Sequence, residues 1–232
     1  MHRGARRPRL RVVQTDLVSR PEEWEAERMR LGIVSDIHCN AEALALALAR
    51  MGDVDELLCA GDAVFEYRFS NDVIGLLRDR GARYVLGNHE HVILDHRGTR
   101  AREVAHVRPE NVRYMAERPD TIKVEIDGKT LLMTHASPIP PHTQYCYPWS
   151  PELEQFAEVD ADFIIIGHTH AQMARRIGRA LVVNPGSAGD ARDHRNGRRL
   201  SYAVLDTSTD EVLIDNFSLG DPTIAEFCTP IH

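Results

Sequence analysis

Three polar residues stand at equal intervals in the first half of the chain, each just after a short apolar run. They are Asp36, Asp62 and Asn88, 26 residues apart. The two intervals contain predicted helices over 41–51 and 71–80, so the order of elements is βαβαβ. This order is typical of a largely parallel sheet with helices on its faces. Because parallel strands end at one edge of their sheet, we expect the three side chains to meet there.

Length and charge narrow the class of protein further. The 232 residues suffice for one sizeable domain, and 43% apolar with 27% charged residues is ordinary for a globular chain. No apolar run reaches the length of about 18 residues that a membrane helix needs, so no membrane partner is expected. A net charge of −7 disfavours nucleic acid as a partner, because such proteins usually present a basic face. Four cysteines without a CxxC pair indicate reduced thiols and hence a cytoplasmic location.

The two ends of the chain differ from its middle. Five arginines lie within 3–11 and acidic residues dominate 21–27, with no apolar stretch of a secretory signal beside them. We interpret 1–29 as a flexible N-terminal extension, 30–220 as the folded domain and 221–232 as a C-terminal tail.

The second half of the chain predicts antiparallel strands and further polar residues that follow strands. Hairpins are expected over the ranges 121–134, 173–183 and 201–217. The first hairpin leads directly into His135. After a proline-rich loop and a predicted helix over 151–159, an apolar strand over 163–166 leads to His168 and His170.

Seven residues that follow these predicted strands have metal-binding side chains. They are Asp36, His38, Asp62, Asn88, His135, His168 and His170. A single strand-end Asp is more often a turn or cap residue, and a single His is more often a satisfied polar group. Three oxygen donors and four imidazoles together, however, are more than one ion needs. They suit two divalent transition-metal ions bridged by one carboxylate, with Mn²⁺ favoured and Fe, Zn or Ni as alternatives.

The same residues belong to short motifs that follow one another in a characteristic order. The motifs are Asp36-Ile37-His38, Gly61-Asp62, Gly87-Asn88-His89-Glu90, His135 and Gly167-His168-Thr169-His170. Over residues 30–217 the chain resembles the calcineurin-like metallophosphoesterases, and in particular their compact single-domain bacterial and archaeal phosphodiesterase branch. The resemblance implies an α/β fold, a four-layer αββα sandwich in which helices flank two mixed sheets. It also implies a metal-dependent phosphoric ester hydrolase.

The resemblance further implies a role for each residue of the site. One ion would be held by Asp36, His38, Asp62 and His170, and the other by Asp62, Asn88, His135 and His168. A hydroxide generated between the ions would attack phosphorus, and His89 would protonate the leaving oxygen as general acid. Asn40, Arg68 and Arg192 are candidates for contact with the substrate. For each arginine, a solvated surface position is an equally good interpretation.

Three departures from the family pattern and several alternatives accompany this interpretation. The loop over 65–69 has bulky and charged residues where related sequences often have Gly and Pro. Glu90 stands where related sequences more often have Asp. Cys39 places a thiol beside the ions, where an oxidisable thiolate is expected. A small-molecule phosphate ester, with diesters favoured, is the expected substrate. A phosphomonoesterase acting on phosphoproteins or nucleotides is the first alternative, a non-catalytic scaffold is the second, and assembly into an oligomer is left open.

Overall fold

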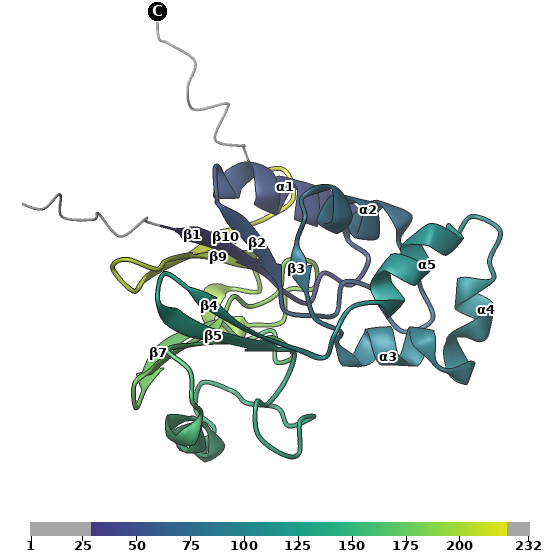
Figure 1. Ribbon diagram of the computed structural model, residues 1–232. Helices are drawn as coiled ribbons and strands as arrows, with labels where there is room; N and C mark the ends of the chain where they lie inside the picture. The colour runs from purple at the N-terminus through teal and green to yellow at the C-terminus, as the bar shows by residue number, and fades with distance from the viewer. Residues whose placement is uncertain (1–28, 222–232) are drawn as a thin grey trace, which may run out of the picture.

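The βαβαβ unit of the first half folds into parallel neighbouring strands of one sheet (Figure 1). The computed structural model describes residues 29–221. The strands of this sheet are β1 (Arg30–Val34), β2 (Glu56–Cys59), β3 (Arg83–Tyr84), β9 (Leu200–Asp206) and β10 (Glu211–Phe217). They lie in the order β10-β9-β1-β2-β3, in which the hairpin of β9 and β10 adds antiparallel strands from the end of the chain.

Helices cover the outer face of this sheet and one end of the molecule (Figure 1). They are α1 (Ala41–Met51), α2 (Asn71–Asp79), α3 (Asn88–Leu94), the short 3₁₀ helix η1 (His96–Gly98), α4 (Thr99–Arg102) and α5 (Pro109–Ala116). Asn40 and Ser70 begin α1 and α2, because their side-chain oxygens accept hydrogen bonds from the amides of Ala43 and Val73. The capping signals in the sequence therefore place both helices correctly.

The second half of the chain forms a mixed sheet that faces the first. Its strands are β4 (Thr121–Ile126), β5 (Lys129–Thr134), β6 (Phe163–Ile165), β7 (Met173–Ile177) and β8 (Ala180–Asn184). They lie in the order β4-β5-β6-β8-β7, with the three central strands parallel and both edge strands antiparallel. The hairpins expected over 121–134 and 173–183 are confirmed.

The outer face of the second sheet is covered by η2 (Pro151–Glu158), a 3₁₀ helix where the sequence predicts a helix over 151–159. Leu153 and Phe156 of η2 share one buried cluster with Ile164 and Val182 of the sheet. A second 3₁₀ turn, η3 (His194–Asn196), precedes β9.

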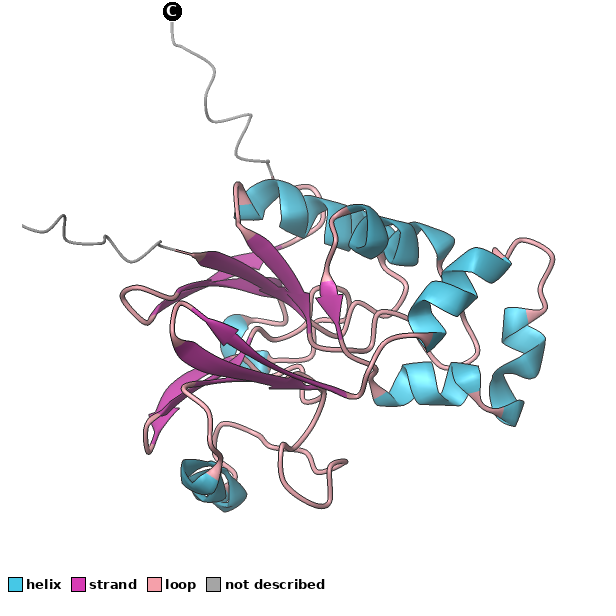
Figure 2. Cartoon of the chain, in the orientation of Figure 1, coloured by secondary structure: helices cyan, strands magenta, loops and turns pink. Residues whose placement is uncertain are grey.

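The two sheets pack face to face, so the layers run helix, sheet, sheet, helix (Figure 2). Period-two alternation sends Leu31 and Ile33 of β1 into a buried cluster between the sheets, which also contains Leu131, Phe163 and Leu205. This is the four-layer αββα sandwich that the resemblance implied, and the expected fold class is confirmed. Within residues 29–221, no helix is long and apolar enough to cross a membrane.

Hydrogen bonds hold both ends of the described residues. The backbone oxygen of Met29 accepts a hydrogen bond from the amide of Thr207 at 3.0 Å. At the other end, the Asp221 carboxylate accepts a hydrogen bond from the Ser218 amide at 2.8 Å. The rest of the predicted extension, 1–28, and of the predicted tail, 222–232, lies outside the described residues.

Candidate metal centre

The loops that follow strands of both sheets bring the seven predicted ligands together. Two groups have ligand atoms within 4.8 Å of one another: Asp36, His38 and His170 in one, and Asp62, His135 and His168 in the other. The Asn88 side-chain oxygen lies 3.1 Å from His135 Nε2 and so joins the second group. All seven residues that the sequence singles out therefore converge, with three from each sheet's loops and Asn88 from the first turn of α3.

Asp62 lies where the two groups meet. Its Oδ2 is 3.2 Å from His135 Nε2. It also belongs to a third group with His38 and His89, whose ligand atoms again lie within 4.8 Å of one another. A carboxylate in contact with members of both groups can bridge two ions.

Backbone carbonyls determine the tautomer of three histidines. The Nδ1 atoms of His38, His135 and His170 lie 3.3, 2.7 and 2.7 Å from the carbonyl oxygens of three loops. Because a carbonyl oxygen only accepts hydrogen bonds, each neutral imidazole has its proton on Nδ1 and its lone pair on Nε2. This arrangement, with Nδ1 donating to the protein and Nε2 bare, is typical of metal-binding histidines.

The unprotonated Nε2 atoms of these imidazoles face other hydrogen-bond acceptors rather than donors. His38 Nε2 and His170 Nε2 are only 3.1 Å apart, and two lone pairs at that distance repel unless a cation lies between them. Asp36 Oδ1 and His168 Nε2 are buried without any hydrogen-bond partner among the described residues. Unpaired buried polar atoms are rare and costly, which makes them a sign of an ion. The residues present therefore fit divalent metal ions.

Electrostatics show that this centre favours positive charge. Burial alone would raise the pKa of Asp36, but the close approach of His170, whose Nε2 lies 3.3 Å from Asp36 Oδ1, outweighs it, and the pKa lies well below its ordinary value. Burial lowers the pKa of His135, yet the charge of Asp62 more than reverses this and raises it to about 10. Burial, with the charge of His135, lowers the pKa of His168 to about 4, so that imidazole keeps a lone pair. The buried carboxylates thus need protons or cations for balance.

Backbone conformation sets the same residues apart. Left-handed φ angles between 51° and 67° occur at Asp36, His38, Asp62, His168 and His170. A residue with a Cβ atom loses about 1–2 kcal/mol in this conformation. Such backbone strain gathers at functional sites, where the surrounding structure maintains it.

Close contacts between loops explain why the motifs at 87–90 and 167–170 begin with glycine. A Cβ atom on Gly87 would lie 2.2 Å from Asp62 Oδ1, and one on Gly167 would lie 1.9 Å from Ser35 Oγ. Neighbouring loops therefore approach so closely that only glycine fits before Asn88 and before His168.

Glu90 holds the loops of the centre in place through hydrogen bonds, a role that sequence reasoning missed. Its buried carboxylate accepts hydrogen bonds from the amides of Asp62, Val64 and Gly87 at 2.9, 3.0 and 2.7 Å, and from the Tyr84 hydroxyl at 2.8 Å. Burial and the charge of Asp62 raise its pKa to about 7. The sequence does contain a signal for this role. In a capping box, a Glu at the third position of a helix accepts a hydrogen bond from the amide of the residue just before the helix, as Glu90 does from Gly87.

His89 differs from its neighbours in the tautomer that it adopts. Its Nδ1 accepts a hydrogen bond from the Glu66 amide at 2.9 Å, so the neutral ring has its proton on Nε2. That Nε2 lies 3.6 Å from Asp62 Oδ2, and the ring stacks on Phe65 with centroids 4.8 Å apart. A protonated Nε2 cannot bind a metal, so the geometry makes His89 a hydrogen-bond donor at the centre.

The three candidate substrate residues lie around the centre, but each has protein partners. The Asn40 amide bonds to Ala43 and Gly189 at 3.1 Å each. The Arg68 guanidinium lies over the Phe65 ring, 4.5 Å from its centroid. Arg192 pairs with Asp190 at 2.5 Å. Asn40 and Arg68 line a cavity of about 510 Å³ beside His38, whereas Arg192 lines a different one.

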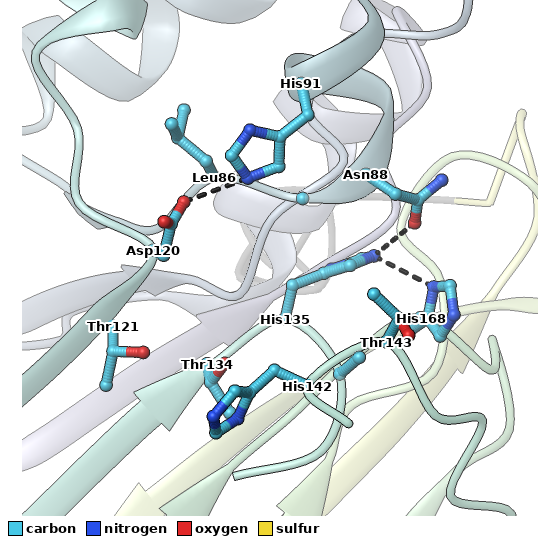
Figure 3. Close-up of a pocket in the computed structure, with 12 residues that line it drawn as sticks. Leu86, Asn88, His91, Asp120, Thr121, Thr134, His135, His142, Thr143 and His168 are labelled. Atoms are coloured by element: carbon cyan, nitrogen blue, oxygen red, sulfur yellow. Dashed lines mark hydrogen bonds and ion pairs between the residues drawn. The ribbon is translucent and has the colours of Figure 1, made fainter. Parts of the chain in front are cut away.

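A further cavity, of about 270 Å³, adjoins the opposite end of the centre (Figure 3). Asn88, His135 and His168 meet at one side of it, joined by the contacts that Figure 3 marks. At another side, His91 Nε2 lies 2.9 Å from the Asp120 carboxylate. The candidate ligands thus border open space on more than one side, which a substrate needs.

The surroundings of Cys39 oppose the thiolate expected of it. Its thiol donates a hydrogen bond to the Arg68 carbonyl at 3.4 Å, and burial raises its pKa to about 11. Burial therefore favours the uncharged thiol near neutral pH, and an oxidisable thiolate beside bound ions stays a prediction.

Comparison with known proteins places this geometry in context. Residues 29–210 match the family described as the calcineurin-like phosphoesterase superfamily domain. An uncharacterized protein of Methanocaldococcus jannaschii is 26% identical over 208 residues, which cover 76% of this chain and 82% of that protein. A metallophosphoesterase structure from Sphaerobacter thermophilus has a TM-score of 0.67 at 24% identity, covering 83% of this chain and 89% of that chain. For an archaeal phosphodiesterase the TM-score is 0.52 at 22% identity, covering 82% of this chain and 100% of that chain.

Proposed function

This chain belongs to the calcineurin-like phosphoesterase superfamily, and from that premise we propose that it is a dinuclear metal-dependent phosphodiesterase. The observation that carries the proposal is the set of facing lone pairs, above all the 3.1 Å between His38 Nε2 and His170 Nε2. A metal ion, or a proton shared by the two nitrogens, relieves that arrangement without moving the backbone carbonyls that orient both rings.

We assign the ligands in two sets that share Asp62. Asp36, His38 and His170 complete the set for one ion, and Asn88, His135 and His168 complete the set for the other. Carboxylate, amide and imidazole donors without a thiolate suit Mn²⁺, with Fe, Zn or Ni as alternatives. When bound, the ions would neutralise phosphate charge and lower the pKa of a bound water.

His89 acts on the leaving group in this proposal. The Glu66 amide keeps the His89 proton on Nε2, at the ring edge that lies near Asp62. From there His89 donates a hydrogen bond to the departing ester oxygen and transfers its proton as general acid. The stacked Phe65 ring restricts rotation of the imidazole and so preserves this direction.

The charge around the centre favours diesters over monoesters. A monoester carries a second negative charge that a diester lacks, and a site for it gains from an additional free cation. Arg192, which lines one neighbouring cavity, is already paired with Asp190, so its charge is largely compensated. Phosphomonoester hydrolysis remains the alternative function. A non-catalytic scaffold has no use for seven converging ligands, so we do not favour it.

The test uses metal-free protein reloaded separately with Mn²⁺, Fe²⁺, Zn²⁺ and Ni²⁺. Elemental analysis should approach two ions per chain, and bis(p-nitrophenyl) phosphate should be hydrolysed faster than p-nitrophenyl phosphate. Asp62→Asn, which removes the shared carboxylate, should lower the metal content, and Asp79→Asn is its matched control because Asp79 is exposed on α2. No metal uptake and no turnover with any of the four ions would refute the proposal.

A further inference from the structure

The proline-rich loop before η2 presents three aromatic side chains at alternate positions. Tyr145, Tyr147 and Trp149 stack in order, with ring planes 14° and 11° apart and centroids at 6.1 and 5.1 Å. We call these three residues the aromatic ladder. Tyr145 is 54% and Trp149 65% exposed. Large apolar side chains gathered on the surface usually mark a binding site.

The ladder starts at the candidate metal centre. The Tyr145 ring stacks on the ligand His168, with centroids 3.8 Å apart and planes 27° apart. At the other end, the Arg195 guanidinium lies 5.3 Å from the centroid of the Trp149 ring. Arg195 is itself held by Asp193 at 2.6 Å and by the Gln172 carbonyl at 2.7 Å. Both ends of the ladder therefore rest on ordered side chains, so little freedom is lost when a ligand binds.

A cavity of about 330 Å³ lies between the ladder and the loop that contains η3. Its lining includes His168 and Thr169 at the metal centre, together with Arg192 and His194 across from the ladder. A volume of this order is typical of small-molecule sites, which combine aromatic walls with a few polar groups. Because His168, a candidate metal-binding residue, borders the cavity, a small molecule bound there would also reach the proposed metal centre.

We propose that the aromatic ladder and this cavity bind the nucleobase of a nucleotide-type phosphate ester whose phosphate lies at the metal centre. Hydrolysis of the bound ester rests on the proposed function, whereas binding of the base does not. A flat base offers a π face to the exposed ring edges and to the Arg195 guanidinium, whereas an aliphatic ester has none. Stacking of one base on aromatic side chains typically changes affinity by about 5- to 150-fold.

Binding can be measured without turnover, through the fluorescence of Trp149. Trp149 is the only tryptophan within residues 29–221, and the chain contains one other, Trp24. In a Trp24→Phe background, AMP should quench this fluorescence, and ribose 5-phosphate, which lacks the base, should not. Tyr145→Leu should weaken AMP binding about 5- to 150-fold, and Tyr145→Phe, which keeps the ring, should restore it.

Turnover gives a second measurement that is matched for the leaving group. The two substrates are the p-nitrophenyl ester of thymidine 5′-phosphate and p-nitrophenyl methyl phosphate. In both, the oxygen of water forms a bond to phosphorus and the bond to p-nitrophenolate breaks, so the leaving group is the same. Tyr147→Leu and Trp149→Leu should raise KM for the thymidine ester and leave kcat/KM for the methyl ester unchanged. Leu213→Ala, which removes an equally exposed apolar side chain outside the three cavities, is the control and should change neither.

The outcomes separate the two proposals. If the metal-loaded chain hydrolyses neither ester but AMP still quenches its fluorescence and ribose 5-phosphate does not, the phosphodiesterase proposal is refuted and the base site is supported. Equal loss on both esters in the ladder variants, or equal quenching by AMP and ribose 5-phosphate, would overturn the base site alone.

Discussion

The sharpest test of the close approach between loops is Gly87→Ala. The φ of Gly87 is −100°, which any residue adopts, so the substitution adds one methyl group and no backbone strain. That methyl would lie 2.2 Å from Asp62 Oδ1 and 2.5 Å from the Asp62 amide nitrogen. Rotation of the carboxylate relieves only the first contact. The loop after β2 must therefore shift by about 1 Å to restore ordinary van der Waals separation.

The size of the effect follows from that shift. Overpacking of this kind typically costs about 1–3 kcal/mol, which for a chain of this length lowers Tm by about 2–12 °C. The shift also moves Asp62, the carboxylate proposed to bridge the ions. A displacement of about 1 Å in a catalytic site can reduce the rate about 10²-fold.

Calorimetry in the presence of a chelator isolates the packing effect from metal binding, and titration with Mn²⁺ then measures affinity. Gly75→Ala is the matched control, because nothing lies within 4 Å of the added methyl and Gly75 is inside α2. It should raise stability by about 0.5–1 kcal/mol. If Gly87→Ala has the same Tm as Gly75→Ala and binds Mn²⁺ with the affinity of the unaltered chain, the close-approach argument is wrong.

Three further predictions concern single side chains of the centre. Asp62→Asn should reduce the metal content by more than loss of one histidine does, as measured by elemental analysis of the two variants side by side. His89→Asn should keep both ions but lose about 10²–10⁴-fold in rate on esters of alkyl alcohols, and much less on nitrophenyl esters, because general acid catalysis matters only for poor leaving groups. Equal losses would exclude the acid role. Alkylation of Cys39, followed by mass spectrometry, should be slow at pH 8 and accelerate up to about pH 11, since burial raises the pKa at which the thiolate forms. Fast alkylation at pH 8 would contradict this.

The sequence contains most of the fold because the apolar runs and helix signals are local. Asn40 and Ser70 mark the starts of α1 and α2, and the turn at 127–128 marks a hairpin. The equal spacing of Asp36 and Asp62 reflects one βα unit, so their convergence at the sheet edge also follows from the pattern.

Other features depend on contacts between distant parts of the chain and were missed. The apolar run before Gly87 predicts a strand up to Leu86, but the structure pairs only Arg83 and Tyr84 in β3, because the Leu86 amide bonds to Pro119 instead. Asn88 then begins α3 rather than ending a strand. The partner at Pro119 has no local signal, and the only local signal for α3 is Glu90, three residues after Gly87.

Side-chain roles were harder to predict than side-chain positions. The sequence leaves Arg192 available for a substrate phosphate, and its pairing with Asp190, two residues earlier, is visible only in the structure. Tyr145, Tyr147 and Trp149 recur at every second residue, a pattern that places side chains on one side of an extended chain. Their proximity to His168 depends on how the loop folds back over the second sheet, which no local pattern encodes.

The distribution of the ligands between the two sheets has a mechanical meaning. Asp36 follows β1 of the first sheet, whereas His170 follows β6 of the second, and Asp62 and His135 are divided in the same way. Each bound ion would therefore be a cross-link between the halves of the sandwich, formed only after the halves have docked. Ion binding at 100 times the Kd adds about 2.7 kcal/mol to stability. In a cell short of metal the chain would lose this cross-link as well as its chemistry, and the opened sandwich would become a substrate for proteases.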